Sequence, residues 1–414
     1  MSIPGQTMGV SVFTDPLLRA TKLSRLQLSN AYLLGTILSG ILLPWGGSAL
    51  DRYGARLTAT LSTFVLGLTL VVLSRIDRIA AFLGSVHAFF ANQAFATGLL
   101  VVAFLCLRFS GQGMLTMTCR TTIGKWFDKR RGLVAGITGV VVSFGFASAP
   151  LFLNKWVTAH GWRSTWVEMA MVVAFGMGTL AWLLLRDSPE ELGLQMDGQK
   201  TSLTENTSQK LVREVEQPEY TRAQALRTIV FWALTYAVAL QGLVITGFTF
   251  HIVDIGADAG LDAHQAVAIF LPMAAVSTLM NLTTGYLSDR VRIRYLLMAL
   301  AAFQCIGALG VTHFASFAGR AFCVLGFGAG GGMFTILTTV ALPRFFGRKH
   351  LGAISGLQMM CIVIGSALGP SMFALARQLS GHYTPALLLC AALPLGHFIL
   401  ALLSNPPAPR HLER

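Results

Sequence analysis

Long runs without a charged residue dominate this sequence and restrict its fold more than any other feature. As helices rising 1.5 Å per residue, runs of about 20 residues would each cross the ~30 Å hydrocarbon layer of a bilayer. Such apolar segments lie at residues 2–18, 28–48, 57–74, 97–122, 132–154, 164–185, 228–250, 264–287, 295–313, 317–342, 351–375 and 384–403. All but the short first one are long enough to span. The pattern predicts an all-α membrane protein.

Composition and charge support this class and exclude others. Of the 414 residues, 54% are hydrophobic and 12% charged, against about 25% charged in typical soluble domains. The net charge of +13 could suggest nucleic-acid binding, but Lys and Arg gather in the connections on one side of the predicted spans. This is the bias of cytoplasmic loops, so we expect a lipid bilayer and no nucleic acid as partner. The six cysteines lie inside apolar runs without metal-binding or redox spacing.

A long polar stretch separates six of the segments from the other six. We predict an N-terminal six-helix bundle at residues 1–186, a cytoplasmic linker with a short surface helix at 187–224, a C-terminal six-helix bundle at 225–404 and a tail at 405–414. Residues 75–96 are half apolar, and we interpret them as an amphipathic excursion on the outer face.

Internal repeats relate the two halves. Gly47, Asp51, Arg52 and Arg56 recur as Gly285, Asp289, Arg290 and Arg294, a shift of 285 − 47 = 238 residues. Gly132, Gly136, Gly145 and Pro150 recur as Gly352, Gly356, Gly365 and Pro370, a shift of 352 − 132 = 220. The 18 extra residues of the first half fall around the 75–96 stretch. Parallel repeats of this kind are a known transporter plan.

The first repeated block, GGSALDRYGARL, contains G-x-x-x-D-R-x-G-x-R. Small residues allow helices to approach closely, and an aspartate can accept hydrogen bonds from helix N-terminal amides. The block resembles the signature between the second and third helices of the major facilitator superfamily, and GYLSDRVRIR resembles its second copy, with Arg292 in place of a glycine. The resemblance implies a cytoplasmic gate formed by Gly47, Asp51, Arg52, Gly54, Arg56, Gly285, Asp289, Arg290 and Arg294.

Further motifs indicate a branch of that superfamily. RFSGQG, from Arg108, resembles its fourth-helix motif; KWFDKRRGLVAGITG, from Lys125, and RFFGRKHLGAISG, from Arg344, resemble monocarboxylate-transporter-like and oxalate/formate-antiporter-like members. The resemblance implies two six-helix bundles, secondary transport by alternating access, a monomer and a plasma membrane, with a bacterial inner membrane favoured. In that branch, anion carriers commonly place basic residues in the eighth and eleventh helices, whereas residues 266–287 and 351–375 contain no Lys or Arg here.

Nucleotide chemistry is not indicated. The glycine-rich GFGAGGG, from Gly326, lies inside an apolar span, where helix packing explains it, and the sequence has no phosphate-binding P-loop. We therefore expect neither a cofactor nor enzymatic activity.

Polar residues inside the spans are the candidates for substrate binding. Arg108 faces Gly328 at the 220-residue shift, and a buried arginine needs a partner or water. Gln6 and Thr7 follow the Pro4-Gly5 break, and interrupted helices expose backbone groups to substrates. The other candidates are Gln112, Gln241, Asn281 and Gln358. Asn281 and Gln358 could equally join helices by hydrogen bonds, and Arg120 could simply extend to the interface. We assign His251 to the outer mouth and His397 to packing.

These features favour a carrier of a small organic anion, such as a mono- or dicarboxylate. The alternative is an exporter of amphiphilic or drug-like compounds, which the missing basic residues favour. A coupling proton could use Glu168, Asp15 or the substrate itself. Finally, residues 3–13 would span only ~16 Å as a helix, about half of the hydrocarbon layer, so we expect about 15 further helical residues upstream of Met1.

Overall fold

The computed structural model describes residues 3–87, 92–198 and 219–404, and the regular elements of these ranges are helices. Ten of the described helices are long and apolar enough to cross a membrane. One of them, α3 (Arg25–Ser74), is 50 residues long and holds two predicted spans. The described chain therefore contains the eleven full-length spans expected from the sequence. The all-α prediction is confirmed.

The chain packs as two units, each with its own core. The first unit comprises residues 1–119 and 145–187, and the second comprises residues 120–144 and 188–414. The division between residues 187 and 188 falls beside the predicted start of the linker at 187. Residues 120–144, which include the predicted entry into the fifth span, pack with the second unit.

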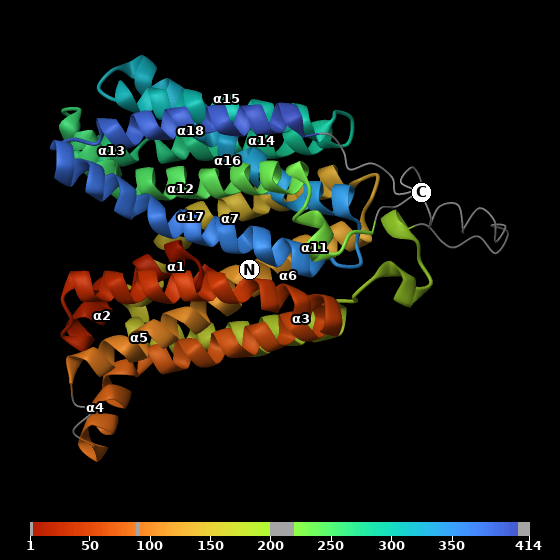
Figure 1. The fold of residues 1–414 in the computed structure, drawn as a ribbon. Coiled ribbons are helices and arrows are strands. Elements are labelled where there is room, and N and C mark those ends of the chain that lie inside the picture. Colours follow the sequence, from red (N-terminus) through yellow and green to blue (C-terminus); the bar gives the residue numbers. More distant parts are fainter. Residues whose placement is uncertain (1–2, 88–91, 199–218, 405–414) are drawn as a thin grey trace. The chain divides into compact units, whose positions relative to one another are not determined.

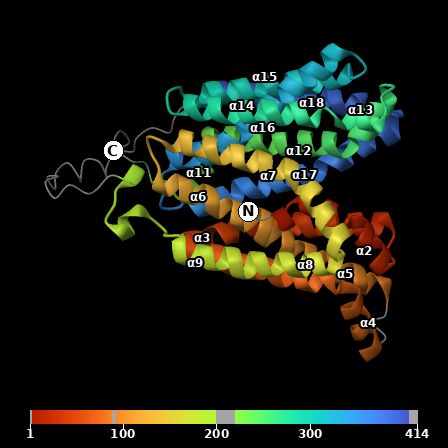
Figure 2. The same ribbon diagram turned by 180° about the vertical axis from the view of Figure 1, so that it is seen from behind.

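The first unit is built around the long helix α3. Its further elements are η1 (Ile3–Gly5), α1 (Thr7–Ser11), α2 (Thr14–Thr21), α4 (Ile76–Val86), α5 (Gln93–Leu107), the π-helix η3 (Arg108–Leu115), α8 (Trp162–Met171), the π-helical η4 (Val172–Met177) and α9 (Gly178–Leu184). Helix α6 (Thr116–Trp126) begins in this unit, and α7 (Arg131–His160) ends in it. Figure 2 shows α8 and α9 running beside α3. Phe13, Phe104 and Trp166 belong to the core of this unit.

Helix α3 contains the two helices that the sequence predicts, joined across a kink inside the first signature block. At this kink Gly54 has φ 81° and ψ 168°, which are not helical backbone angles. A side chain rarely adopts this backbone conformation, whereas glycine does so without a Cβ clash. The turn between the second and third spans is therefore reduced to a single residue.

The other deviations also lie in the first unit. The short first segment forms three brief helices. Gln6, with extended backbone angles (φ −93°, ψ 156°), separates η1 from α1, and a turn at residues 12–13 separates α1 from α2. The stretch predicted as an amphipathic excursion contains α4, while residues 88–91 lie outside the described ranges. One side of α4 packs through Ile76, and Phe82 and Val86 are exposed.

The second unit contains six long helices after the linker. Its elements are η5 (Pro189–Leu192), η6 (Met196–Gly198), α11 (Arg222–Ala225), α12 (Ile229–Asp258), α13 (Ala263–Val267), α14 (Phe270–Ser288), α15 (Ile293–Thr312), α16 (Phe317–Phe346), α17 (Leu351–Ser380) and α18 (Thr384–Leu403). Helix α12 packs along α17 (Figure 1), and α15 packs against both α16 and α18. Part of the predicted linker, residues 199–218, lies outside the described ranges.

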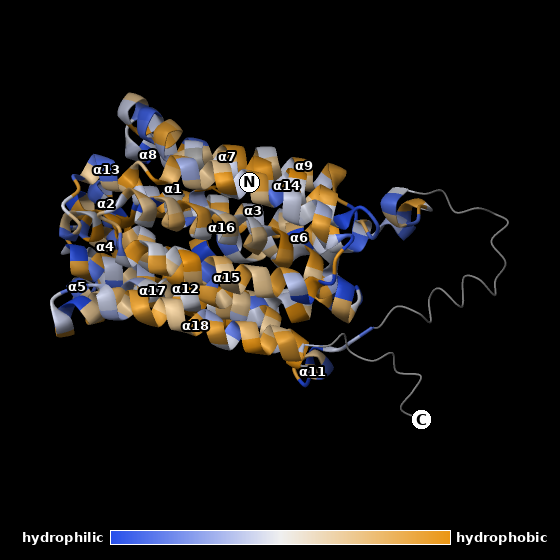
Figure 3. Cartoon of the chain, turned by 90° about the horizontal axis from the view of Figure 1, so that it is seen from above, coloured by the Kyte–Doolittle hydropathy of each residue, from blue (hydrophilic) through white to orange (hydrophobic). Residues whose placement is uncertain are grey.

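The surface of the spanning helices is apolar. Leu271, Phe317 and Leu379 are each more than three-quarters exposed. Figure 3 shows hydrophobic residues along the lengths of the helices. Exposed apolar area of this extent marks a surface that contacts lipid rather than water. The described chain is a multi-pass membrane protein.

Candidate functional site

The break in the first segment brings backbone against backbone in the first unit. Gly5, at the end of η1, faces Gly111 in the π-helix η3: a Cβ on Gly5 would lie 2.5 Å from the Gly111 Cα and 3.0 Å from the Leu107 oxygen. Only a pair of glycines allows this approach. The contact places the first turn of the chain directly beside the RFSGQG motif.

Arg108 opens η3 and points its guanidinium at this first turn. Its side chain is buried, with 2% relative exposure. Nη1 donates to the Gly5 carbonyl at 3.3 Å and to the Thr7 hydroxyl at 3.2 Å. Its guanidinium carbon lies 5.4 Å from the centroid of the Tyr32 ring, within the range of a cation–π contact. The Arg108 Nε is buried without a hydrogen-bond partner among the described residues.

The partners of Arg108 are neutral. Tyr32 donates its hydroxyl proton to the Thr7 oxygen at 3.1 Å, and Gln6 Nε2 donates to the Thr116 hydroxyl at 3.5 Å. Within the described chain, no carboxylate forms an ion pair with Arg108. A buried cation held only by dipoles and an aromatic face is incompletely compensated. The arrangement suits a ligand that brings a negative charge.

Of the four candidates that the sequence places in the first half, the structure joins Thr7 to Arg108 by a hydrogen bond. Gln6 precedes Thr7 in the chain and donates to Thr116, and Gln112 lies in the same π-helix as Arg108, with its buried Oε1 unpaired among the described residues. Sequence reasoning missed Tyr32. Its signal was weak because a tyrosine inside an apolar span is compatible with ordinary packing.

The second unit holds a buried chain of side-chain amides. Gln304 Nε2, on α15, donates to the Gln241 Oε1 on α12 at 3.0 Å and to the Ala237 carbonyl at 3.2 Å. The Gln304 Oε1 is an amide oxygen and can only accept, so His397 Nδ1 on α18 donates to it, at 3.4 Å. The Gln241 Nε2 is left as a buried donor without a partner among the described residues. Its amide lies against Gly330 of α16.

The other two candidates of this unit lie apart from that chain. Asn281 Nδ2 donates to the Ser143 hydroxyl at 3.2 Å, joining α14 to α7, while its Oδ1 is unpaired among the described residues. Gln358 Nε2 on α17 is likewise buried and unpaired within the described ranges. Asn281 therefore does join helices, which was one of the two alternatives, and its free oxygen leaves the other open.

Arg120 stands against the eleventh predicted span, which carries no basic residue of its own between residues 351 and 375. Its Nη1 lies 4.0 Å from the Met359 sulfur of α17, and its guanidinium carbon lies 5.6 Å from the centroid of the Phe334 ring of α16. Arg120 is partly buried. The second unit thus contains a positive charge beside the part of α17, residues 351–375, that has no Lys or Arg of its own.

The second copy of the signature binds a helix N-terminus. Asp289 Oδ1 accepts from the backbone N–H of Gly132 at 3.1 Å, at the start of α7. Gly285 and Gly132 pack backbone to backbone, since a Cβ on Gly285 would lie 2.5 Å from the Gly132 oxygen. Burial raises the pKa of the Asp289 carboxyl, and the amides of Gly132 and Leu133 oppose this rise. The interaction is that of an anion with the positive end of a helix.

The first copy uses a different aspartate for its turn. The Arg56 backbone N–H donates to Asp187 Oδ1 at 2.9 Å, and the Asp187 carboxylate occupies the space beside Gly54. Arg56 Nε donates to the Trp182 carbonyl at 2.6 Å, and its guanidinium carbon lies 4.3 Å from the Trp182 ring centroid. The motif therefore joins the turn to the end of the sixth span. Asp187 was not among the predicted residues.

The remaining motif residues are placed more simply. Gly47 is buried inside α3, which also contains Asp51, and the Arg52 guanidinium lies 5.4 Å from the Tyr53 ring centroid. In the second copy, Arg290 and Arg294 lie over the rings of Tyr286 and Tyr295 at 3.6 Å and 5.3 Å respectively.

Acidic residues of the linker cap the turns that precede α7 and α17. Asp197 accepts from the backbone N–H groups of residues 128–130 at 3.0–3.3 Å. Glu219 accepts from those of Arg348 and Lys349 at 3.3 Å and 2.9 Å. Since 348 − 128 = 220, the capped turns are equivalent in the repeat. The sequence shows acids in the linker but not which amides they reach.

Neither acid considered for proton coupling is buried. Glu168 accepts from Trp156 Nε1 at 2.6 Å and pairs with His160 at 3.0 Å, and its side chain is 41% exposed. Asp15 pairs with Arg25 at 3.0 Å and is 66% exposed. Both are surface ion pairs, which contribute little to stability.

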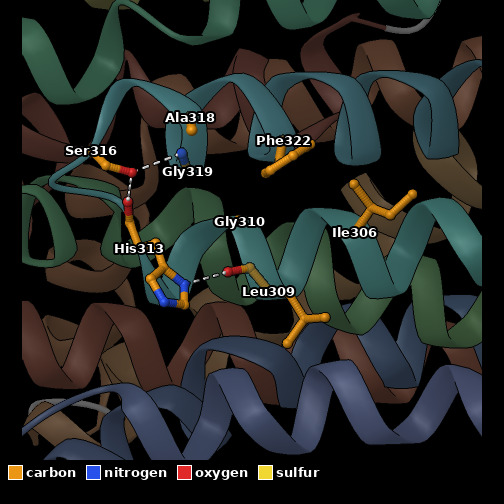
Figure 4. A pocket seen from close by; sticks show the side chains of 8 residues that line it. All are labelled: Ile306, Leu309, Gly310, His313, Ser316, Ala318, Gly319 and Phe322. Carbon is orange, nitrogen blue, oxygen red and sulfur yellow. Dashed lines mark hydrogen bonds between the residues drawn. The ribbon is translucent and has the colours of Figure 1, made fainter.

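The second unit has a groove of about 450 Å³ between α15 and α16. Figure 4 shows its lining, which is apolar except at one end, where His313 and Ser316 make hydrogen bonds to their own turns. None of the predicted site residues lines it. We therefore place the candidate site at the buried polar clusters and not in this groove.

The helix arrangement and the duplicated signature define a multi-pass secondary transporter. The family model of the Major Facilitator Superfamily matches residues 3–370, and the chain belongs to this superfamily. Its members and the relatives below are transporters, not enzymes. The predicted family and its fold of two six-helix bundles are confirmed.

Individual relatives agree with this assignment. The chain is 28% identical over 360 residues to monocarboxylate transporter 13 of Rattus norvegicus, covering 84% of this chain and 75% of that protein. It is 26% identical over 206 residues to the riboflavin transporter RibJ of Trypanosoma brucei brucei, a match that covers 49% of this chain but only 34% of RibJ. The solved fucose:proton symporter FucP of E. coli has a TM-score of 0.66 at 15% identity, with 96% of this chain and 95% of that chain covered.

Proposed function

We propose that this transporter carries a small organic anion by alternating access, with Arg108 as the group that binds the anionic end of the substrate. The observation that carries the proposal is the environment of Arg108: a guanidinium with 2% exposure whose described partners are a carbonyl, a hydroxyl and an aromatic ring. An uncompensated buried charge is costly, and a carboxylate would neutralise it through charge-assisted hydrogen bonds.

The polar groups of the second unit support a substrate with further hydrogen-bonding groups. Gln241 offers a fixed NH₂ donor, Asn281 an unpaired carbonyl oxygen and Gln358 an unpaired NH₂ donor. Gln6, Thr7 and Gln112 are proposed as neutral contacts beside Arg108. The similarity to monocarboxylate transporter 13 favours a carboxylate.

Uptake of a panel of labelled mono- and dicarboxylates into proteoliposomes tests the proposal. We expect Arg108→Ala to reduce uptake about 10- to 100-fold, because a charge-assisted pair contributes about 1.5–3 kcal/mol; the Gly5 carbonyl also loses this donor, whereas Thr7 keeps its bond from Tyr32. Arg108→Lys should keep part of the activity because it keeps the charge. Arg25→Ala, which removes an exposed arginine of the same unit, is the matched control.

Two results would overturn the proposal. One is carboxylate uptake by Arg108→Ala equal to that of the control, in protein with an unchanged unfolding midpoint. The other is a purified wild-type protein that moves no carboxylate but does move a neutral or cationic compound.

The second candidate is export of an amphiphilic or drug-like compound. Its specific support is that Gln241, Asn281 and Gln358 are neutral, and that residues 266–287 and 351–375 supply no cation. The similarity of part of the chain to the riboflavin transporter RibJ is compatible with a larger heteroaromatic substrate. Efflux of a fluorescent amphiphile from inverted vesicles, insensitive to Arg108→Ala, would favour this candidate.

Several further assignments complete the proposal. We assign the protein to the plasma membrane, with a bacterial inner membrane favoured, and the linker and C-terminal tail to the cytoplasm. The two signature copies then lie on the cytoplasmic side and serve as the gate. The protein acts as a monomer, and a proton is a candidate coupling ion.

A further inference from the structure

A compact hydrogen-bonded cluster surrounds His251 near the end of α12. His251 is 9% exposed, and its ring stacks on Phe373 of α17, with 6.2 Å between ring centroids and 6° between planes. His251 Nε2 lies 3.0 Å from the Pro370 carbonyl, and Nδ1 lies 3.0 Å from the Tyr383 hydroxyl. The same hydroxyl lies 3.3 Å from Asp254 Oδ2. The cluster joins α12 to α17 and to the N-cap of α18.

The cluster has too few protons for all of its close contacts to be hydrogen bonds. A carbonyl only accepts, so the bond to Pro370 requires a proton on Nε2. In the neutral imidazole, Nδ1 is then an acceptor, and Tyr383 must donate to it. A phenol has one proton, so it cannot also donate to Asp254. The neutral cluster therefore satisfies only two of its three close contacts.

We propose that His251, Tyr383 and Asp254 form a proton-binding site, in which the bound proton rests on Nδ1 of His251. With that proton in place, Nδ1–H donates to the Tyr383 oxygen, and the Tyr383 hydroxyl is free to donate to Asp254. All three contacts are then hydrogen bonds. Asp254 Oδ2 also lies 3.9 Å from Nδ1, near enough to stabilise the imidazolium charge.

The exposure of the three groups defines a route for the proton. The Asp254 side chain is 63% exposed, whereas that of His251 is 11% exposed, and Tyr383 connects them. A proton taken up by the Asp254 carboxylate passes to the Tyr383 oxygen as the phenolic proton moves to Nδ1. Tyrosine ends neutral, Asp254 is again ionised, and the imidazole carries one positive charge.

Two further charged residues, Arg377 and Asp258, lie near the cluster and pair with each other. Arg377 of α17 pairs with Asp258 of α12 at 2.5 Å, and its guanidinium carbon lies 4.8 Å from the Tyr383 ring centroid. Burial and the negative charge of Asp254 raise the pKa of the Tyr383 hydroxyl, so it remains a donor. In the described chain, no charged side chain of α13, α15, α16 or α18 bonds to these groups. Because Asp258 neutralises Arg377, Asp254 is the net charge that His251 faces.

A proton site can serve any substrate, so it is independent of the proposed anion. It gives His251, which the sequence places at the outer mouth, a chemical role. Neither Glu168 nor Asp15 offers a comparable relay, since each ends in a surface ion pair.

The first test compares thermal unfolding of detergent-solubilised wild type and His251→Gln at about pH 5.5 and about pH 8, on either side of the ordinary titration range of histidine. A glutamine cannot take up a proton. We expect the gap between their unfolding midpoints to be larger at the lower pH, because protonation completes the cluster. The pH dependence of that gap should vanish in the Asp254→Asn and Tyr383→Phe backgrounds. His264→Gln, an exposed histidine of the same unit, should show no such gap.

The second test observes the ring itself by ¹⁵N NMR of histidine-labelled protein. The resonance lost in His251→Gln should show both nitrogens protonated at about pH 5.5 in the wild type. It should be neutral in Asp254→Asn at the same pH. If His251→Gln does not fold, the resonance that responds to the exposed Asp254→Asn change identifies the ring. A neutral ring at that pH in the wild type, or a gap that is equal or smaller at low pH, would overturn the proton site. Neither result depends on which substrate is carried.

Discussion

The contact between Gly5 and Gly111 makes the geometry of the Arg108 cluster testable with a single methyl group. In Gly5→Ala, the new Cβ would lie 2.5 Å from the Gly111 Cα and 3.0 Å from the Leu107 oxygen. Carbon atoms pack at about 3.5–4.0 Å. Both obstructing groups are backbone, so no side chain can rotate away. The first turn must therefore move from η3 by about 1–1.5 Å.

The expected losses of stability and of substrate affinity follow from the contacts that this displacement breaks. Gly5 O is 3.3 Å from Arg108 Nη1, so a further ångström ends this hydrogen bond and pulls Thr7 in the same direction. Overpacking of this kind costs about 1–3 kcal/mol of stability. Losing one charge-assisted hydrogen bond that positions the guanidinium costs about 1.5–3 kcal/mol, which is about a 10- to 100-fold loss of substrate affinity.

The assay combines the unfolding midpoint with the concentration dependence of uptake in proteoliposomes. The control is Gly98→Ala on α5 of the same unit, where a Cβ meets no atom within 4 Å. Because alanine favours a helix interior over glycine by up to about 1 kcal/mol, the control should be unchanged or slightly more stable. If Gly5→Ala matches the control in both measurements, the first turn does not position Arg108 and our reasoning about this cluster is wrong.

Three further predictions concern other contacts. The bidentate Arg163–Asp77 pair, at 2.7 and 2.8 Å, lowers the pKa of the Asp77 carboxyl through the Arg163 hydrogen bonds. Its stabilisation is present above the unfolded-state value of about 4 and is lost as pH falls below it. Arg163→Ala should therefore lower the unfolding midpoint more at neutral pH than in strong acid, where only its bond to the Ser74 carbonyl and its contact with Trp162 are lost. Asp197→Ala and Glu219→Ala should each cost about 1 kcal/mol, as helix caps do, and an additive double variant in denaturation would show that the two turns are capped independently. Gln304→Leu should cost about 1–3 kcal/mol by unpairing the buried amide beside it, and equal stability to wild type would contradict the bonded amide chain.

The sequence was sufficient for the fold and for part of the site, for identifiable physical reasons. Span length and the absence of charge are set by the bilayer, so the helices could be read directly. Arg108 and the Pro4-Gly5 break are each unusual inside an apolar run, and the structure joins Gly5 and Thr7 of this break to Arg108. A charged or helix-breaking residue inside an apolar span is a strong signal because the bilayer tolerates few such residues.

Other features depend on which side chains the fold places opposite one another, and they could not be predicted from the sequence. Tyr32 and Gln304 are ordinary residues on apolar helices, and their roles arise only because Thr7 and His397 lie opposite them. His397 was assigned to packing, whereas its Nδ1 donates to Gln304 and so fixes which way that amide points. The single-residue turn at Gly54, between the second and third spans, could not be predicted either, because a helix break and a loop have similar sequences.

The repeat separates what the scaffold needs from what the substrate needs. Both copies cap the turn before their fifth helix with a linker acid, Asp197 in one and Glu219 in the other, because exposed backbone amides at equivalent turns require an acceptor in each copy. At the same shift, Arg108 corresponds to Gly328 in α16, where the polar groups are instead the amides of Gln241 and Gln304. Features that both copies keep serve the scaffold, so we expect specificity to arise where the repeats differ. We therefore propose Arg108 and Gln241, rather than the duplicated signatures, as the residues to exchange in changing the substrate.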